Sequence, residues 1–285
     1  MQVPVSVSSG QALIKSGCGA GAEGGADVRA VILAAGRGSR IGAETDGCPK
    51  CLIELAGSSL LEWQLRSLAA AGINRILVVG GYRSELLCGE YELARNERWA
   101  ATGVVATLAE AADWLSQGTC VVSYSDIVFH PAHVRQLCAS EAHISITYDK
   151  AWETLWNERF ESPLTDAETF AQSGGWLTAI GARASTVGDI EGQFMGLLRL
   201  TPAGAAQLLA CWNRVNDAER DRMDMTTLLA RLLREGASIC TVAVSGRWCE
   251  VDRSEDLTLY RRRIVNANAD DRRWLHDWRY DWNSP

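Results

Sequence analysis

Residues 28–50 constrain this chain more than any other stretch, because an apolar run there ends abruptly in a glycine-rich, basic segment. Residues 31–33 are apolar and mostly β-branched, which is typical of a buried strand in a parallel sheet. The small residues that follow allow the backbone to approach a ligand closely. Backbone N–H groups exposed at such a strand end bind phosphate oxygens. The stretch therefore predicts a phosphate-binding loop directly after the first strand.

Fixed positive charge accompanies the loop, in Arg37, Arg40 and Lys50. Such cations bind triphosphates and stabilise the charge that develops during their reaction. The glycine spacing differs by one residue from the dinucleotide-binding fingerprint, and the chain contains no P-loop motif. The alternative to a dedicated phosphate loop is an ordinary glycine-rich turn between a strand and a helix.

The charge and the cysteines narrow the class of protein. A net charge of −7 over 285 residues disfavours nucleic acid as a partner, so the basic loop is a local exception. No apolar run is long enough to span a membrane. Cys48 and Cys51 form a C-x-x-C, but no second pair or nearby His completes a zinc site. We therefore expect free thiols in a cytoplasmic enzyme, with a redox or zinc role for this pair as the alternative.

Alternating strand and helix signals predict a doubly wound α/β sheet. Apolar, β-branched runs indicate further strands at residues 76–79, 119–124, 144–148, 192–200 and 238–244. Spacing and capping residues indicate helices that begin near Ser59, Pro131, Pro202, Asp224 and Ser254, and another over residues 104–115. Aromatic and acidic residues interleave over 152–176, which predicts a lid over the open face of the sheet. Such an aromatic wall with carboxylates suits a small cationic group.

The chain divides into three parts by composition. Residues 1–27 are rich in Gly, Ala and Ser, and we expect a disordered leader there. Residues 28–265 form one compact domain, and residues 266–285 form a polar, Trp-rich tail. Trp274, Trp278 and Trp282 are four residues apart, which predicts a stripe of indoles on one helical face. That stripe packs against this chain or against a second copy in a homodimer.

Two carboxylates are candidate metal ligands. Asp126 follows the predicted strand at 119–124, and Asp252 lies beyond the predicted strand at 238–244. Strand ends on one edge of an open parallel sheet form its ligand crevice. Mg²⁺ near phosphates takes hard oxygen ligands, which aspartates provide. The alternative role for each side chain is to cap a helix.

These features together resemble the small-molecule nucleotidyltransferases. Their pattern L-A-A-G-x-G-x-R, followed by P-K, is matched at residues 33–40 and 49–50. Within that family the resemblance is strongest to the cytidylyltransferases that act on phosphonates and on phosphocholine, through residues 148–170, 192–196 and 224–226. The resemblance covers residues 28–265 and implies a Rossmann-like, GT-A-like nucleotidyltransferase domain with a mixed, mostly parallel sheet and a substrate lid.

The resemblance also implies a reaction. CMP would pass from CTP to a small phosphonate, such as 2-aminoethylphosphonate or phosphonoformate, with Mg²⁺ as cofactor and release of pyrophosphate. Phosphocholine and sugar 1-phosphates are the alternative acceptors. Because the attacking oxygen is already an anion, no general base is needed. The four histidines show no catalytic spacing, and we expect them at the surface.

Site residues follow from positions in the matched motifs. Arg40 and Lys50 are expected to contact the phosphates as catalytic residues, and Asp126 and Asp252 to hold the metal. The segment at Thr102 departs from the family pattern, since Gly103 stands where Asn is expected. Nucleotide contacts are expected from Leu33, Ala34, Ala35, Gly36, Gly38, Gly81, Thr102 and Ser125. Acceptor contacts are expected from Asp149, Trp152, Trp156, Arg159, Asp166 and Gln193.

Overall fold

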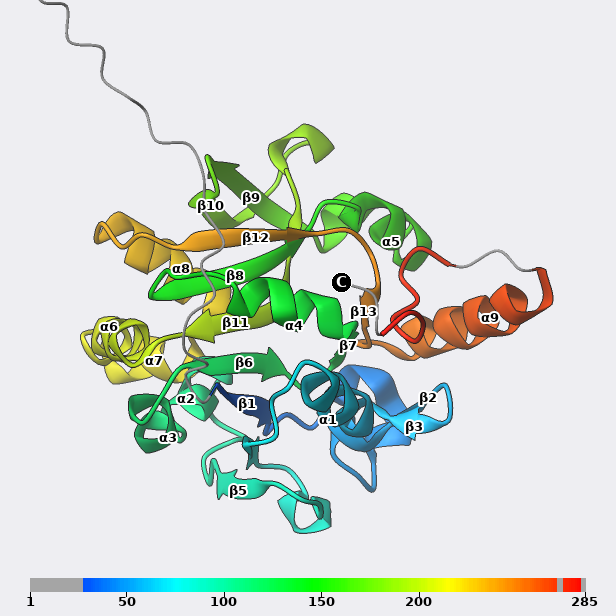
Figure 1. Ribbon diagram of the computed structural model, residues 1–285, viewed down its shortest axis with the longest axis horizontal. Helices are drawn as coiled ribbons and strands as arrows, with labels where there is room; N and C mark the ends of the chain where they lie inside the picture. Colours follow the sequence, from blue (N-terminus) through cyan, green and yellow to red (C-terminus); the bar gives the residue numbers. More distant parts are fainter. Residues whose placement is uncertain (1–27, 271–273, 283–285) are drawn as a thin grey trace, which may run out of the picture.

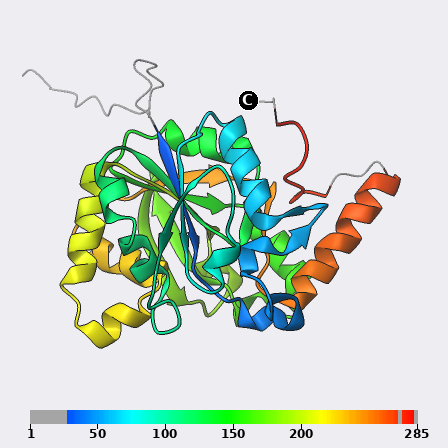
Figure 2. The same ribbon diagram turned by 90° about the horizontal axis from the view of Figure 1, so that it is seen from below.

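The computed structural model describes residues 28–270 and 274–282, so the leader expected at 1–27 lies outside the described residues. The described residues form a mixed nine-stranded sheet with helices on both faces (Figures 1 and 2). The α/β fold class predicted from the sequence is confirmed. In spatial order the strands are β5 (Glu92–Arg95), β4 (Ile76–Gly80), β1 (Arg29–Ala34), β6 (Cys120–Tyr124), β11 (Gln193–Leu200), β8 (Ile144–Asp149), β12 (Cys240–Val244), β10 (Trp176–Arg183) and β9 (Glu168–Ser173).

Most strands of this sheet run in one direction. The pairs β4–β5, β1–β4, β1–β6 and β8–β12 are parallel. The exceptions are β11, which is antiparallel to β6 and β8, and β10, which is antiparallel to β12 and β9. The segment expected to form a lid instead supplies a helix and the β9–β10 hairpin, which completes one edge of the main sheet.

Two helical layers bury separate apolar clusters against the sheet. Strand β1 contributes to both, because alternate side chains point to opposite faces: Ile32 packs in one cluster and Val31 in the other. The first cluster includes α1 (Leu60–Ala70), α4 (Pro131–Cys138), α5 (Trp152–Arg159) and α9 (Ser254–Asp270). The second includes α2 (Val104–Ala109), α3 (Ala112–Ser116), α6 (Pro202–Asn213) and α8 (Met225–Arg234), and the short α7 (Asp217–Arg222) joins the last two.

Local sequence signals explain where the helices begin. Ser59 and Glu62 form a reciprocal capping box at the start of α1. Thr201 caps α6 and Asp224 caps α8, each by accepting a backbone N–H with its side chain. The single helix predicted over residues 104–115 is wrong, because the chain leaves helical geometry at Ala111 and forms α2 and α3.

The carboxyl ends of β1, β4 and β6 meet at one edge. Register places Ala34 beside Gly80 and Leu33 beside Tyr124. A small antiparallel pair, β7 (Ile127–Phe129) and β13 (Trp248–Glu250), continues from this edge, and a second small pair is formed by β2 (Glu54–Leu55) and β3 (Ser58–Ser59). Asp126 directly precedes β7 and Asp252 follows β13, so the small sheet brings two distant segments to the same edge.

The tail differs from its prediction. Helix α9 ends at Asp270, and residues 274–282 contain no helix, so the four-residue spacing of the tryptophans does not form a helical stripe. Trp278 is nevertheless fully buried, edge-on to Trp63 with ring centroids 5.8 Å apart. Trp282 also packs edge-on against Trp63. These indoles pack within this chain, which is one of the two arrangements expected from the sequence.

The prediction that the histidines lie at the surface is wrong for His130, His133 and His276, which are buried. His143 is exposed as expected. Burial lowers the pKa of His130, and it lowers the pKa of His133 to about 3. These two rings are therefore neutral at physiological pH and act as interior packing groups.

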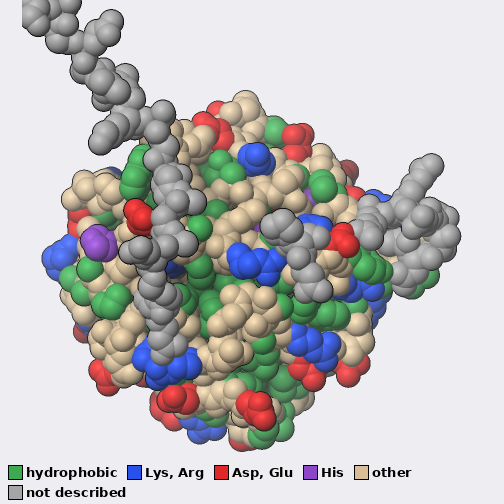
Figure 3. Space-filling model, in the orientation of Figure 1, with side chains coloured by type: hydrophobic (Ala, Val, Ile, Leu, Met, Phe, Trp, Pro, Cys, Tyr) green, Lys and Arg blue, Asp and Glu red, His purple; other side chains and the backbone are tan. Residues whose placement is uncertain are grey.

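The cysteines of the described segments are free thiols, as expected. Burial raises the pKa of Cys51 to about 12, which argues against a redox role for the C-x-x-C. No helix among the described residues has the length and apolar composition needed to cross a membrane. Acidic and basic side chains are interspersed over the face shown in Figure 3.

Replacing Trp278 with Ala is expected to lower the free energy of unfolding by about 3–5 kcal/mol, because a fully buried indole leaves a large cavity. Trp176, which is 46% exposed, is the matched control, and its replacement with Ala is expected to cost less than about 1 kcal/mol. Urea unfolding of the three proteins measures both values. Equal losses for the two variants would contradict this account of the tail.

Candidate active site

The loop after β1 leads Lys50 back into the strand-end crevice. Gly38 adopts φ +72°, and a Cβ there would lie 2.9 Å from Cβ of Lys50. Glycine is thus required both for the backbone conformation and for the path of the lysine side chain. The Lys50 side chain is 9% exposed and ends between Asp126 and Asp252.

A first cleft of about 310 Å³ opens beside this lysine. Its wall contains most of the residues expected to contact the nucleotide, together with the expected cations and carboxylates. Ala34 and Gly81 do not line it: Ala34 packs in the core, and a Cβ on Gly81 would lie 2.7 Å from the carbonyl oxygen of Ala35. The expected residues in the wall are Leu33, Ala35, Gly36, Gly38, Thr102, Ser125, Arg40, Lys50, Asp126 and Asp252.

The first cleft also contains residues that sequence reasoning missed. Trp99 lies in an irregular segment and Thr107 in the predicted helix over residues 104–115, so no signal marked either as a cleft residue. Asn96 holds this segment in place by donating from its side-chain nitrogen to the hydroxyl groups of Thr102 at 2.9 Å and Thr107 at 3.1 Å. Tyr124, at the end of β6, lines the cleft as well.

A buried ammonium bridges the two candidate metal ligands. Lys50 Nζ lies 2.8 Å from Oδ2 of Asp126 and 3.0 Å from Oδ1 of Asp252. Arg40 Nη1 lies 2.5 Å from Oδ2 of the same Asp252. Burial by itself lowers the pKa of Lys50, but the charges of Asp126 and Asp252 outweigh it and raise that pKa. The lysine therefore remains protonated.

Asp126 and Asp252 fit a metal ion that is bound jointly with phosphate. Oδ1 of Asp126 is buried and has no hydrogen-bond partner. Mg²⁺ is typically held by one or two carboxylates together with substrate phosphates and waters. Within residues 28–270 and 274–282, no group of three or more His, Cys, Asp or Glu side chains is arranged to hold a metal. A metal at this site would complete its coordination with phosphate oxygens or waters.

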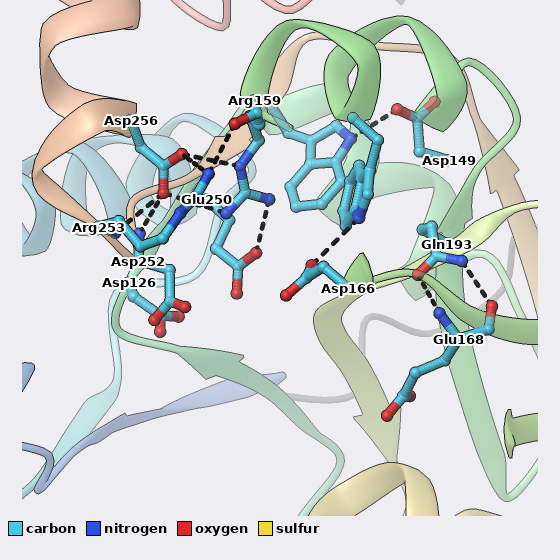
Figure 4. Close-up of polar contacts among 12 residues, drawn as sticks. Asp126, Asp149, Arg159, Asp166, Glu168, Gln193, Glu250, Asp252, Arg253 and Asp256 are labelled. Carbon is cyan, nitrogen blue, oxygen red and sulfur yellow. Dashed lines mark hydrogen bonds and ion pairs between the residues drawn. The ribbon is translucent and has the colours of Figure 1, made fainter. Parts of the chain in front are cut away.

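A buried arginine supports the Asp252 segment. Arg159 Nε and Nη2 donate to Asp256 at 3.0 and 3.1 Å, and Nη1 donates to Glu250 at 3.0 Å (Figure 4). Asp256 Oδ2 in turn accepts the backbone N–H groups of Asp252 and Arg253 at 2.9 Å each. The expectation that Arg159 contacts the acceptor is corrected, because its side chain is 1% exposed and its charge is already neutralised.

A second cleft of about 240 Å³ adjoins the first and shares Arg40, Tyr124 and Asp252 with it. Three of the expected acceptor residues, Trp156, Asp166 and Gln193, lie in its wall. The wall also contains aromatic and acidic residues, namely Phe194, Trp248, Glu168, Asp224 and Glu250.

Three carboxylates in the wall of the second cleft lack basic partners among the described residues. Asp166 accepts from the indole N–H of Trp156 at 3.1 Å, and Asp224 caps α8. Burial, Asp224 and Asp166 raise the pKa of Glu168, although a hydrogen bond with Thr226 opposes them. No ion pair within the described residues joins these three carboxylates to Lys or Arg. We call these three carboxylates the acidic end of the second cleft.

Two other acceptor expectations are corrected. Asp149 is fully buried, and its oxygens accept hydrogen bonds from Trp248, His276, Gly246 and Ala151. Trp152 is 3% exposed and packs edge-on against Trp156. Both residues belong to segments at the strand-end edge, but their side chains point into the core. They therefore lie behind the cleft wall.

Gln193 has a positioning contact as well as a place in the wall. Its Nε2 donates to the carbonyl oxygen of Glu168 at 2.7 Å, which ties β11 to β9 (Figure 4). Glu168, Phe194 and Asp224 stand in the stretches that resemble the phosphonate branch, and that signal marked their neighbourhood. Their grouping around one cavity required the fold.

Comparison with known proteins identifies the family of this chain. Residues 30–183 match the model described as a MobA-like NTP transferase domain. The chain is 31% identical over 247 residues to CTP:phosphoglutamine cytidylyltransferase of Campylobacter jejuni, across 81% of this chain and 98% of that relative. It is 33% identical over 113 residues to 2-aminoethylphosphonate cytidylyltransferase of Lancefieldella rimae, across 38% of this chain and 46% of that relative.

Solved structures agree on the fold. The inositol-1-phosphate CTP transferase from T. maritima superposes with a TM-score of 0.65 at 18% identity, over 83% of this chain and 96% of that chain. The CTP:phosphocholine cytidylyltransferase from Streptococcus pneumoniae gives a TM-score of 0.65 at 17% identity, over 84% and 99%. The fold is thus the GT-A-like fold of nucleotidyltransferases. The family match and the full-length relative together show that this chain belongs to the MobA-like NTP transferase family.

Proposed function

We propose that this protein is a cytidylyltransferase that transfers CMP from CTP to a small phosphonate or phosphomonoester, with release of pyrophosphate. One observation carries the proposal: Lys50, Asp126, Asp252 and Arg40 meet where two clefts join. The preference for CTP is inferred from the relatives, which are named as cytidylyltransferases.

The reaction suits this arrangement. An oxygen of the acceptor attacks the α-phosphorus of CTP, a new P–O bond forms, and the bond to the β-phosphate oxygen breaks so that pyrophosphate leaves. The attacking group is anionic at neutral pH, so the principal barrier is repulsion between two anions. Arg40 and Lys50 reduce that repulsion and hold both phosphorus groups at the junction of the clefts.

The metal has a defined place in the proposal. Asp126 and Asp252 are the residues that would hold Mg²⁺, through carboxylate oxygens that phosphate ligands complete. When bound, the metal supplies further positive charge against the phosphates. Lys50 and Arg40 now occupy three of the four oxygens of these carboxylates, so we expect incoming phosphates to compete for both cations.

The second cleft favours an acceptor with a cationic group. Arg40 lines both clefts, so we place the phosphorus end beside it, and Asp166, Glu168 and Asp224 supply carboxylates without basic partners elsewhere in the wall of the second cleft. Trp156 and Phe194 add aromatic faces that attract ammonium groups. This favours 2-aminoethylphosphonate over phosphonoformate, whose carboxylate would meet uncompensated acidic side chains.

Phosphorylated amino acids form the second candidate class of acceptor. The relative that aligns over nearly its whole length is named for phosphoglutamine. An amino acid carries both an ammonium and a carboxylate group. Its ammonium suits the acidic end of the cleft, so a substrate panel needs to include this class beside phosphonates, phosphocholine and sugar 1-phosphates.

Replacing Lys50 or Asp126 with Ala is expected to lower turnover by roughly 10²–10³-fold, because each change removes a fixed charge at the reacting phosphates. Arg220→Ala is the control, since Arg220 pairs with Asp217 and lines neither cleft. Pyrophosphate release from CTP measures the rates, and circular dichroism checks folding. Near-normal turnover in both cleft variants would exclude the assignment.

Removal of divalent metal with a chelator is expected to abolish pyrophosphate release, and added Mg²⁺ is expected to restore it. The reason is that two carboxylates with phosphate oxygens form a suitable magnesium site. A titration of Mg²⁺ against rate makes the measurement, with Asp252→Asn expected to require more metal. Full activity in thoroughly chelated protein would contradict a role for the metal.

Glu168→Gln is expected to weaken discrimination between 2-aminoethylphosphonate and ethylphosphonate, which lacks the ammonium. Loss of a charged hydrogen bond corresponds to about 10- to 100-fold in kcat/KM for the amino substrate. The surface substitution Glu161→Gln, which lines neither cleft, is the control. If wild-type protein used both phosphonates equally, the acidic end would have no part in acceptor choice.

A further inference from the structure

Residues 274–282, which we call the C-terminal segment, lie against the small sheet of β7 and β13 (Figure 1). The backbone N–H of Arg247 donates to the carbonyl oxygen of Leu275 at 2.9 Å, directly before β13. The carbonyl oxygen of Tyr280 lies 2.9 Å from Nε2 of His130, directly after β7. Arg135 Nη2 donates to the carbonyl oxygen of Trp282 at 3.1 Å. The segment is therefore attached to both strands that lead to the candidate active site.

A buried carboxylate joins this segment to the cleft wall. Asp149 Oδ2 accepts from Nε1 of Trp248 at 2.9 Å and from Nε2 of His276 at 3.0 Å. Burial would raise the pKa of Asp149, but the hydrogen bonds from His276, Gly246 and Trp248 outweigh burial and lower it. Because the carboxylate is ionised, His276 Nε2 must carry the proton and donate it.

Trp248 links Asp149 to the second cleft, because it donates to this carboxylate and also lines the cleft. Its indole is 1% exposed overall yet belongs to the cleft wall. Its ring lies 6.3 Å from that of Trp156, whose own indole N–H holds Asp166 at the acidic end. Trp248 also begins β13, the strand that leads through Glu250 to Asp252. A shift of Trp248 therefore moves one wall of the acceptor cleft.

We propose that His276 is a positioning residue, through which the C-terminal segment fixes Trp248 and so shapes the acceptor cleft. The occupant of that cleft rests on the proposed function. His276 touches neither cleft itself, and acts by sharing one oxygen of Asp149 with the indole of Trp248. Without His276, the buried carboxylate loses a donor and must find another, which a closely packed interior allows only by rearranging.

We expect the C-terminal segment to influence the second cleft, which we assign to the acceptor, more than the first cleft, which we assign to the nucleotide. Trp248 and Trp156 line the second cleft and are absent from the wall of the first. The nucleotide loop is held instead by Gly38 and by Thr45, whose hydroxyl donates to the carbonyl oxygen of Gly38 at 3.2 Å. The Michaelis constants for the two substrates should therefore respond differently.

The kinetic test compares His276→Ala with His276→Gln. His276→Ala is expected to raise KM for the acceptor about 10-fold while KM for CTP stays within about twofold, since small displacements of a binding wall have effects of this size. His276→Gln keeps a side-chain N–H donor and is expected to recover most of the loss. If His276→Ala does not fold, His276→Leu keeps the volume without the donor and replaces it.

Leu208→Ala controls for general loss of stability. Leu208 is fully buried in α6, on the opposite face of the sheet, and its truncation is expected to destabilise the fold without changing either KM. An acceptor KM that rises equally in Leu208→Ala, or that stays unchanged in His276→Ala, would overturn the proposal.

A second measurement is independent of turnover. The ¹⁵N-labelled indole N–H signals of Trp248 and Trp156, assigned by Trp→Phe substitution, are expected to shift in His276→Ala and to stay in place in Leu208→Ala. If the wild type converts none of the acceptors tested, the proposed function fails. The indole signals still test whether His276 positions Trp248. Unchanged signals in His276→Ala would refute it.

Discussion

One buried ammonium group, Nζ of Lys50, joins segments that lie 76 and 202 residues away in the chain. Asp126 comes from the end of β6 and Asp252 from beyond β13, and both face the loop that follows β1, where Asp252 also pairs with Arg40. Two neighbouring carboxylates repel each other in a poorly solvated cleft, so a bridging cation stabilises their approach. The junction of the two clefts depends on this contact.

The distribution of charge around the junction explains how one cavity system can hold two anions. Among the described residues that line the two clefts, the basic groups are Arg40, which lines both, and Lys50, which lines the first, and each pairs with aspartate. The wall of the second cleft also contains Asp166, Glu168 and Asp224, which have no basic partners among the described residues. For the proposed zwitterionic acceptor, the favourable orientation places the phosphorus group beside Arg40 and the ammonium group beside these carboxylates.

The sequence allowed prediction of the groups whose position depends on a strand end. A continuous apolar run located β1, the glycines located the loop, and Asp126 and Asp252 followed from the rule that ligands bind at the carboxyl edge of a parallel sheet. Asp149 also ends a strand at that edge, but its side chain turns inward, toward Trp248 and His276. Sequence position alone does not determine which way such a side chain points.

Other features depended on long-range packing that no local pattern contains. The tryptophans of the tail are spaced as on a helix, yet Trp278 is buried by contact with Trp63 in an irregular segment. The sequence predicts that Arg159 contacts the acceptor, but its guanidinium group is buried and pairs with Asp256. The grouping of Glu168 with Asp224 requires β9 to pair with β10, on which α8 packs, and only the sheet order provides this arrangement.

A crystal structure with a non-hydrolysable CTP analogue and Mg²⁺ tests the central claim most directly. The account predicts a triphosphate in the first cleft, with Lys50 and Arg40 on its phosphate oxygens and the metal between those oxygens and the carboxylates of Asp126 and Asp252. A nucleotide bound elsewhere, with Lys50 still bridging the two aspartates, would contradict it.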